Sequence, residues 1–220
     1  MIKIENLSKK YNSKRNSVVA LNEVSLSIEK GEFISIVGPS GSGKTTLLLC
    51  MGGLIHPSVG KVNIDGASIY DMDIKGRAAF RLRNLGFVFQ TFNLIPYLTA
   101  LENVQIPLSL AGTANGNQTE RATELLEKLG LGDRLNHKPR ELSIGQQQRV
   151  AIARALANNP KIIMADEPTG NLDPNTTNET VAYLNLLNQT GITVVMVTHN
   201  PGVAESAQRT LKLVDGRLIE

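Results

Sequence analysis

The sequence predicts an α/β fold, in which a mainly parallel sheet is flanked by helices. The first observation is a buried strand at 32–37 that runs through a glycine-rich loop into a helix at 46–51. The second is the return of continuous apolar runs at 161–165 and 193–198, with a helical pattern at 176–189 between them. Continuous apolar runs are typical of strands that are covered on both faces, and intervening helices allow neighbouring strands to run parallel.

The composition is that of an ordinary folded domain. Hydrophobic residues make up 41% and charged residues 20% of a chain of 220 residues, which is long enough for a sizeable core. No apolar run approaches the ~18 residues of a membrane-spanning helix, and the N-terminus lacks a signal-peptide stretch. The single cysteine, Cys50, excludes an internal disulfide and agrees with a reducing compartment, so we expect a cytoplasmic protein. The formal net charge of +3 is small and dispersed, and we expect no nucleic-acid partner.

The first 90 residues contain further strands and one further helix. Apolar and polar residues alternate at 2–4 and 24–28, so the N-terminal part is expected to be rich in strands. Residues 61–66 are expected to form a strand that enters a turn, residues 74–83 a helix, and residues 86–89 a short buried strand.

The composition changes between about 91 and 160, where the helical pattern dominates. A second helix is expected at 144–158, and the chain is expected to close with a hairpin at 211–219. We therefore predict a single domain over 1–220, with a helical subdomain at about 91–160. One apolar stripe at helical spacing in this subdomain consists of Ala122, Leu125, Leu126 and Leu129.

The glycine-rich loop fits a phosphate-binding motif. Residues 38–45 follow the pattern G-x-x-x-x-G-K-S/T without a mismatch. Glycines let the backbone wrap so that several N–H groups point at phosphate oxygens, and the helix that follows adds its positive end. We expect Lys44 to contact the β- and γ-phosphates and the Thr45 hydroxyl to be a ligand of Mg²⁺. The alternative is an ordinary Gly/Ser turn, which the strand–loop–helix context disfavours. The predicted nucleotide contacts here are Gly38, Pro39, Ser40, Gly41, Ser42, Gly43, Lys44, Thr45 and Thr46.

Three polar side chains follow two later buried strands. The strand at 161–165 ends in Asp166 and Glu167, and the strand at 193–198 is followed by His199. Ligands of parallel sheets bind beyond the C-terminal strand ends, so all three are expected at the nucleotide. Asp166 suits the Mg²⁺ position, Glu167 suits the attacking water, and His199 suits the γ-phosphate. The alternatives are a surface acidic pair that caps the next turn and a turn histidine.

Residues 142–149, with the sequence LSIGQQQR, form a polar turn that opens a helix. Ser143 and Gly145 can present a hydroxyl and N–H groups to an anion. A serine at a helix start is common in any protein, so this pattern alone leaves both interpretations open.

These motifs, in this order, resemble those of the ATP-binding-cassette ATPases. Residues 38–45 match the Walker A loop of that family, residues 163–167 match Walker B with its catalytic glutamate, and residues 142–146 resemble the signature Leu-Ser-Gly-Gly-Gln. The similarity spans essentially the whole chain. Further matches are Gln90 to the conserved-loop glutamine, Asn171-Leu172-Asp173 to the loop that touches the partner subunit, His199 to the switch histidine and Tyr11 to the aromatic residue that stacks on adenine.

The resemblance implies a fold and a mechanism. The fold is a phosphate-loop core with a mainly parallel sheet, an N-terminal antiparallel β-subdomain and a helical insertion. The mechanism is hydrolysis of ATP with Mg²⁺ in a head-to-tail dimer, where ATP drives closure and hydrolysis allows opening. In one subunit the catalytic residues are Glu167 and His199, and the metal ligands are Thr45, Gln90 and Asp166. The residues contributed in trans are Ser143, Gly145, Gln146 and Asp173.

Residues 92–104 and 168–173 look like one branch of the family, the lipoprotein-releasing, macrolide-export and cell-division-type branch. This branch implies an ATPase subunit that powers export or release through a separate transmembrane permease, from the cytoplasmic face of the cell membrane. The apolar segment 92–98 is the candidate groove for a cytoplasmic helix of the permease, and the alternative is that it belongs to the core of the insertion. Ile144 stands where the signature has its first glycine, so we expect an active site in which the isoleucine can slow hydrolysis.

Two other classes of function share parts of the pattern. One is a soluble ATP-binding-cassette ATPase in DNA repair, translation or cofactor assembly, but the sequence shows neither long coiled coils nor a second cassette. The other is a phosphate-loop kinase or GTPase, which does not account for residues 142–148 together with His199. Co-purification with a membrane subunit would favour transport, and a basic groove would favour nucleic acid.

Overall fold

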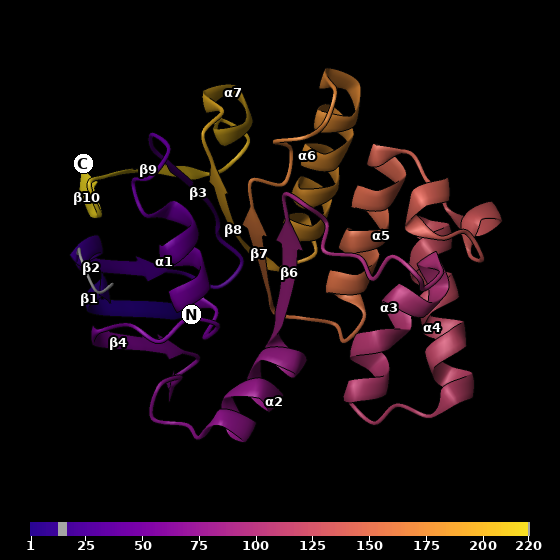
Figure 1. The fold of residues 1–220 in the computed structure, drawn as a ribbon, viewed down its shortest axis with the longest axis horizontal. Helices are drawn as coiled ribbons and strands as arrows, with labels where there is room; N and C mark the ends of the chain where they lie inside the picture. Colours follow the sequence, from indigo (N-terminus) through magenta and orange to yellow (C-terminus); the bar gives the residue numbers. More distant parts are fainter. Residues whose placement is uncertain (13–16, 220) are drawn as a thin grey trace. The chain divides into compact units, whose positions relative to one another are not determined.

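The structure, a computed structural model, describes residues 1–12 and 17–219, and the chain divides into two compact units (Figure 1). Residues 1–78, together with those from 185 onwards, form unit 1, and residues 79–184 form unit 2. Two helices, α2 (Ile74–Asn84) and α6 (Pro174–Gln189), cross the boundary between the units along the chain. None of the helices in the described part of the chain combines the length and the apolar character needed to cross a bilayer.

Unit 1 begins with an antiparallel sheet. The central strand β1 (Ile2–Asn12) pairs with β2 (Ser17–Ile28) on one side and with β4 (Val59–Ile64) on the other, and β4 pairs with the short β5 (Ala67–Ser68). The alternating residues Ile2 and Ile4 are buried, at 1% and 2% exposed, because one face of the sheet is covered. The antiparallel N-terminal part that the resemblance implied is thus confirmed.

The second sheet segment of unit 1 is mainly parallel. Strand β3 (Phe33–Val37) runs parallel to β8 (Thr193–Thr198) and to β9 (Arg209–Val214), and β9 forms the closing hairpin with β10 (Arg217–Ile219). All of β8 and most of β3 are buried, which explains why both appear in the sequence as continuous apolar runs. The helix α1 (Lys44–Met51) follows β3, and the short α7 (Pro201–Ala204) follows β8.

Unit 2 combines one parallel strand pair with a group of helices. Strand β6 (Leu85–Phe89) runs parallel to β7 (Ile162–Asp166), and α3 (Ala100–Leu110), α4 (Asn115–Lys128) and α5 (Ile144–Leu156) pack against one another (Figure 1). Residues 91–99 form an irregular loop before α3, so the first regular helix of the expected helical subdomain begins at Ala100. The short helices η1 (Gly132–Arg134) and η2 (Pro139–Glu141) connect α4 to α5.

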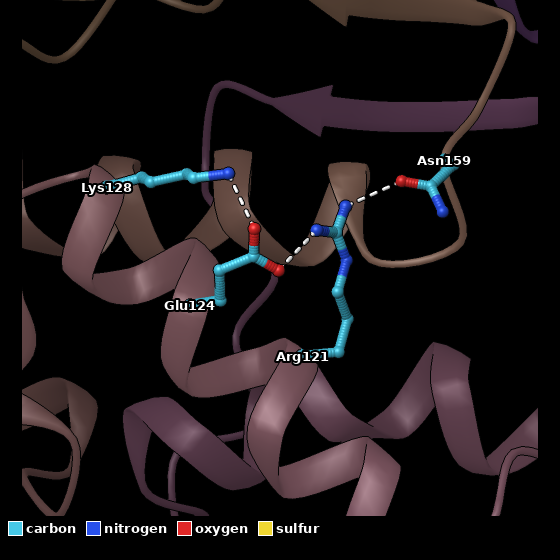
Figure 2. A network of polar contacts seen from close by, with 4 residues as sticks. All are labelled: Arg121, Glu124, Lys128 and Asn159. Carbon is cyan, nitrogen blue, oxygen red and sulfur yellow. Dashed lines mark hydrogen bonds and ion pairs between the residues drawn. The ribbon is translucent and has the colours of Figure 1, made fainter.

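A charged network ties α4 to the segment that precedes β7 (Figure 2). The guanidinium of Arg121 donates to Glu124 Oε2 (2.7 Å) and to Asn159 Oδ1 (2.6 Å), and Lys128 Nζ donates to the other oxygen of Glu124 (2.6 Å). Exposed pairs of this kind are screened by solvent and contribute little to stability, so the network orients α4 more than it stabilises the fold. The predicted apolar stripe of α4 and the turn that follows it is buried, with Leu126 at 0% exposed.

Candidate functional site

The phosphate loop connects β3 to α1 in unit 1. The ammonium of Lys44 lies over the loop, because Nζ donates to the carbonyl oxygens of Gly38 (2.8 Å) and Pro39 (3.1 Å). The helix α1 begins directly after Gly43, and no side chain caps its first turn. The N–H groups of that turn, the helix dipole and the ammonium therefore form an anion cradle around the loop.

Two glycines of this loop have no room for a side chain. A Cβ atom at Gly38 would lie 2.1 Å from the carbonyl oxygen of Leu213, and one at Gly43 would lie 2.2 Å from that of Ala20. Gly43 also has a φ of 101°, which side-chain-bearing residues rarely adopt. The loop is thus packed on the backbones of β9 and β2, two neighbours that the motif itself does not identify. The Ser42 hydroxyl lies buried inside the loop, without a hydrogen-bond partner among the described residues.

Strand register places His199 beside the start of the phosphate loop. Val37 of β3 pairs with Thr198 of β8, so Gly38 and His199 follow neighbouring strand ends. Neighbouring strands lie about 4.8 Å apart, and unit 1 therefore brings the predicted histidine close to the loop. Its contact with a γ-phosphate stays a prediction.

Tyr11 lies near the end of β1 and is 42% exposed. The Lys9 ammonium lies 5.1 Å from the centroid of its ring, a cation–π contact on an exposed aromatic side chain. An exposed ring of this kind suits a stacking partner, and the predicted role of Tyr11 at adenine stays a prediction.

In unit 2 the strand pair β6–β7 brings two predicted site residues together. Phe89 pairs with Asp166, so Gln90 and Glu167 follow neighbouring strand ends. Gln90 is also joined to Asn171 by two reciprocal hydrogen bonds. The Gln90 Nε2 donates to Asn171 Oδ1 (3.3 Å), and the Asn171 Nδ2 donates to the Gln90 carbonyl oxygen (3.1 Å). This pair joins the predicted conserved-loop glutamine to the predicted partner-contact loop, a link between residues 81 positions apart that sequence reasoning missed.

The same contact explains Gly170. A Cβ atom at Gly170 would lie 2.7 Å from the Gln90 amide nitrogen, so a larger residue would displace the glutamine side chain. A side chain at position 170 would therefore require the Gln90 side chain to shift from its place beside Asn171.

The backbone of Glu167 is held in a conformation that side-chain-bearing residues seldom adopt. Its φ is 47°, in the left-handed region. Two hydrogen bonds support it: Gly170 N donates to the Glu167 carbonyl oxygen (3.1 Å), and Gln148 Nε2 of α5 donates to the Pro168 carbonyl oxygen (2.7 Å). Such conformations persist where the surroundings determine them, and they cluster at functional sites. The backbone at Glu167, a half-buried residue, is therefore held by the loop and by α5 together.

The signature segment forms a capping box at the start of α5. The Ser143 Oγ accepts from Gln146 N (3.2 Å), and the Gln146 Oε1 accepts from Ser143 N (2.9 Å). This box uses the Ser143 oxygen as an acceptor, while its hydroxyl proton remains a donor for an anion. Ile144 is 54% exposed and has no positive φ, so its backbone does not need the freedom of glycine. Its predicted effect on the hydrolysis rate stays a prediction.

Gly145 lies against the start of α6. A Cβ atom at Gly145 would lie 2.7 Å from Thr176 Cγ2. The Thr176 hydroxyl donates to Asp173 Oδ2 (2.6 Å), and hydrogen bonds from Thr176 hold the pKa of the Asp173 carboxyl below its usual value. The signature and the predicted partner-contact residue Asp173 are thereby linked within one chain.

The expected magnesium site does not rely on a cluster of histidine, cysteine and carboxylate side chains. In the described part of the chain no group of three or more such side chains could hold a metal ion. The predicted set instead consists of the Thr45 hydroxyl, the Gln90 amide oxygen and one carboxylate, Asp166. These are hard oxygen donors of the kind that Mg²⁺ takes together with substrate phosphates. The Gln90 side-chain nitrogen donates a hydrogen bond to Asn171, so the side-chain oxygen is the atom that can act as a metal ligand. An oxygen donor at this position fits Mg²⁺.

Comparison with known proteins places these motifs in a wider group. A family model described as ABC transporter matches residues 21–170. The chain is 50% identical over 220 residues to an uncharacterized ABC transporter ATP-binding protein, MJ1508, of Methanocaldococcus jannaschii, and the match covers 100% of this chain and 98% of that protein. It is 48% identical over 219 residues to the lipoprotein-releasing system ATP-binding protein LolD of Bacteroides thetaiotaomicron, with 99% of each chain covered.

Two further similarities concern a longer protein and a solved structure. The macrolide export ATP-binding/permease protein MacB of Syntrophobacter fumaroxidans is 46% identical over 219 residues, which cover 98% of this chain but 31% of that protein. The dimeric post-hydrolysis structure of the ATP-binding cassette MJ0796, bound to ADP and Pi, superimposes with a TM-score of 0.93 at 47% identity and covers 100% of this chain and 97% of that one. The predicted fold class is confirmed.

Proposed function

Since the chain belongs to the ABC transporter family, we propose that it binds and hydrolyses ATP between two head-to-tail copies of itself. It is the ATP-hydrolysing subunit of a membrane-embedded transporter of the export or release type. MacB joins an ATP-binding part and a permease in one protein, of which the match covers 31%. We propose that the membrane partner of this chain is a separate transmembrane permease.

The observation that carries the proposal is the geometry of the phosphate loop. An ammonium held over two loop carbonyls, at an uncapped helix start, is an arrangement for a polyphosphate. We assign Lys44, the Gly38 N–H and the N–H groups of residues 40–46 to the phosphates and Tyr11 to the adenine. When bound, Mg²⁺ neutralises charge on the β- and γ-phosphates, and Thr45, Gln90 and Asp166 are its proposed ligands.

Hydrolysis requires a base for the attacking water, a group that stabilises charge, and closure of the site against bulk solvent. Glu167 accepts a proton from the attacking water, whose oxygen forms the new bond to the γ-phosphorus while the bond to the bridging oxygen of ADP breaks. His199 donates a hydrogen bond to the γ-phosphate oxygens, where charge is concentrated. The second copy closes the site with Ser143, Gly145, Gln146 and Asp173. Release of inorganic phosphate removes the contacts of Ser143 and Gly145, and the two copies separate.

The docking segment, residues 92–98, is the proposed contact with the permease. None of its side chains is buried, and Tyr97 is 71% exposed, so the segment is not part of the core of the helical insertion. An exposed apolar segment of this kind suits a cytoplasmic helix of the permease. We therefore propose that the protein works on the cytoplasmic face of the cell membrane. We also propose that residues 1–220 act as one domain, with the helical subdomain at about 91–160.

The test is the variant Glu167→Gln, with Glu179→Gln on the exposed part of α6 as its matched control. We expect Glu167→Gln to slow phosphate release by about 10²–10⁴-fold, the usual contribution of a general base, while ATP binding is retained. The same variant is expected to elute as a dimer with ATP and as a monomer without it. Phosphate release at the wild-type rate would contradict the role of Glu167. A monomer at millimolar ATP would contradict the shared site.

A further inference from the structure

We propose that Arg154 of α5 is a positioning residue that fixes the docking segment to the signature helix, so that a partner that moves the segment also moves Ser143. The inference rests on the docking role proposed above. It concerns unit 2 alone, where the docking segment, α3 and α5 all lie.

Arg154 holds the first two residues of the docking segment. Its guanidinium donates to the carbonyl oxygen of Phe92 (2.7 Å) and to that of Asn93 (2.5 Å). Phe92 and Asn93 have φ values of 57° and 49°, so two consecutive non-glycine residues are in the left-handed region. This unusual turn directs two adjacent carbonyls toward one guanidinium, whose planar fork suits paired acceptors. Partial burial, which lowers the pKa of Arg154, agrees with a structural rather than a solvated cation.

The other end of the docking segment is held by Asn103 of α3. This side chain is 0% exposed. Its Oδ1 accepts from Ile95 N (2.8 Å), and its Nδ2 donates to the carbonyl oxygens of Ile95 (3.2 Å), Leu98 (3.2 Å) and Thr99 (2.9 Å). The segment is therefore irregular in conformation but attached at both ends, while Tyr97 between the attachments is exposed.

The helix α5 connects this attachment to the signature. Ser143 caps its start and Arg154 lies in its last turn. At 1.5 Å per residue the two positions are about 17 Å apart along one continuous helix. Between them, Gln148 bonds to the Pro168 carbonyl oxygen, next to Glu167. A force applied at Phe92 and Asn93 thus acts on the element that carries Ser143. Coupling between two sites is reciprocal, so a nucleotide clamped on Ser143 must in turn alter the docking segment.

Hydrogen–deuterium exchange on the full chain tests this inference, with Glu167→Gln as the parent protein. The variant is Arg154→Met, and the matched control is Arg149→Met on the same helix, because Arg149 donates to the Leu129 carbonyl oxygen (3.2 Å) and not to the docking segment. Without nucleotide, we expect Arg154→Met to raise exchange in a peptide over 92–99 at least tenfold and Arg149→Met to leave it unchanged. With ATP, both variants are expected to dimerise, and the docking segment is expected to change its exchange only in the parent and in Arg149→Met.

Equal exchange of residues 92–99 in the two variants would overturn the inference, as would an ATP response of the segment that survives in Arg154→Met. Should Arg154→Met not fold, Arg154→Lys keeps the charge without the fork, and exchange of the segment equal to that of the parent would likewise overturn it. A merely structural role would lower the unfolding temperature without removing the response to ATP. If the parent itself stays monomeric with ATP, the proposed function fails instead, and the nucleotide-free comparison still decides whether Arg154 holds the segment.

Discussion

The contact between Gly145 and Thr176 allows a steric role of the signature glycine to be separated from a role at phosphate. The change is Gly145→Ala, made alone and together with Thr176→Ser. A Cβ atom at Gly145 would lie 2.7 Å from Thr176 Cγ2 and 3.2 Å from Thr176 Oγ1. The serine removes the methyl group and keeps the hydroxyl, which donates to Asp173 Oδ2 (2.6 Å).

Two opposing effects determine how much Gly145→Ala changes the free energy of unfolding. Insertion of a methyl group into a packed site costs about 1–3 kcal/mol. Replacement of glycine by alanine in a helix gains up to about 1 kcal/mol, and less in the first turn, where Gly145 lies. We therefore expect Gly145→Ala to lower the free energy of unfolding by about 1–2 kcal/mol, or roughly 2–8 °C in unfolding temperature. In the Thr176→Ser background the expected loss falls to about zero, which is a coupling of about 1–2 kcal/mol.

The assay is urea denaturation followed by circular dichroism for the four proteins of the cycle, with ATP hydrolysis measured in parallel. Restored stability without restored hydrolysis would assign Gly145 a second role at phosphate. A Gly145→Ala protein that is equally destabilised in both backgrounds would refute the steric argument, since the Thr176 methyl group would then not be the obstacle.

Two further predictions concern a buried thiol and the docking segment. Burial raises the pKa of Cys50 to about 11 from 9.0, so iodoacetamide at pH 8 should label the folded chain at least about a hundredfold more slowly than the urea-unfolded chain. Because the pKa of Cys50 is higher in the folded chain, the neutral thiol contributes stability that is fully present below pH 9.0 and is lost as the pH rises toward 11. The variant Cys50→Ala should remove this pH dependence of the free energy of unfolding. Equal labelling of the folded and unfolded chains would contradict the burial of the thiol. Tyr97→Asp should weaken binding of the co-purified permease at least about tenfold and leave ATP affinity unchanged, whereas Leu186→Asp, at a 56% exposed position of α6, should do neither.

Features that depend on neighbours along the chain could be predicted from the sequence. The phosphate loop requires glycines and a lysine at fixed spacing, and strands buried on both faces require continuous apolar runs, so β3, β7 and β8 were correctly located. The closing hairpin β9–β10 could also be predicted locally, because a turn sequence lies between two short strand-like runs.

Features that depend on side chains far away in the sequence could not be predicted from it. Residues 91–99 form a loop whose backbone carbonyls are bound by Arg154 and Asn103, and no local pattern in the sequence marks these contacts. The Gln90–Asn171 pair joins residues 81 positions apart, and no local pattern marks it. Hydrogen bonds from side chains to the backbone compete with the hydrogen bonds of a helix. Only the folded structure shows which of the two a segment forms.

The signature segment shows where its departure from the family pattern can be tolerated. Ser143 and Gln146 form the capping box, and Gly145 has no room for a Cβ atom, so these three positions are restricted by the fold of a single chain. Leu142 is restricted as well, since it is 6% exposed. Ile144 is the exception: it is 54% exposed and its φ is not positive. Glycine at that position therefore brings no advantage to the isolated subunit, and Ile144→Gly should slightly destabilise it. We expect any gain from the glycine to arise in the proposed ATP-bound dimer, in which a second copy would cover this surface.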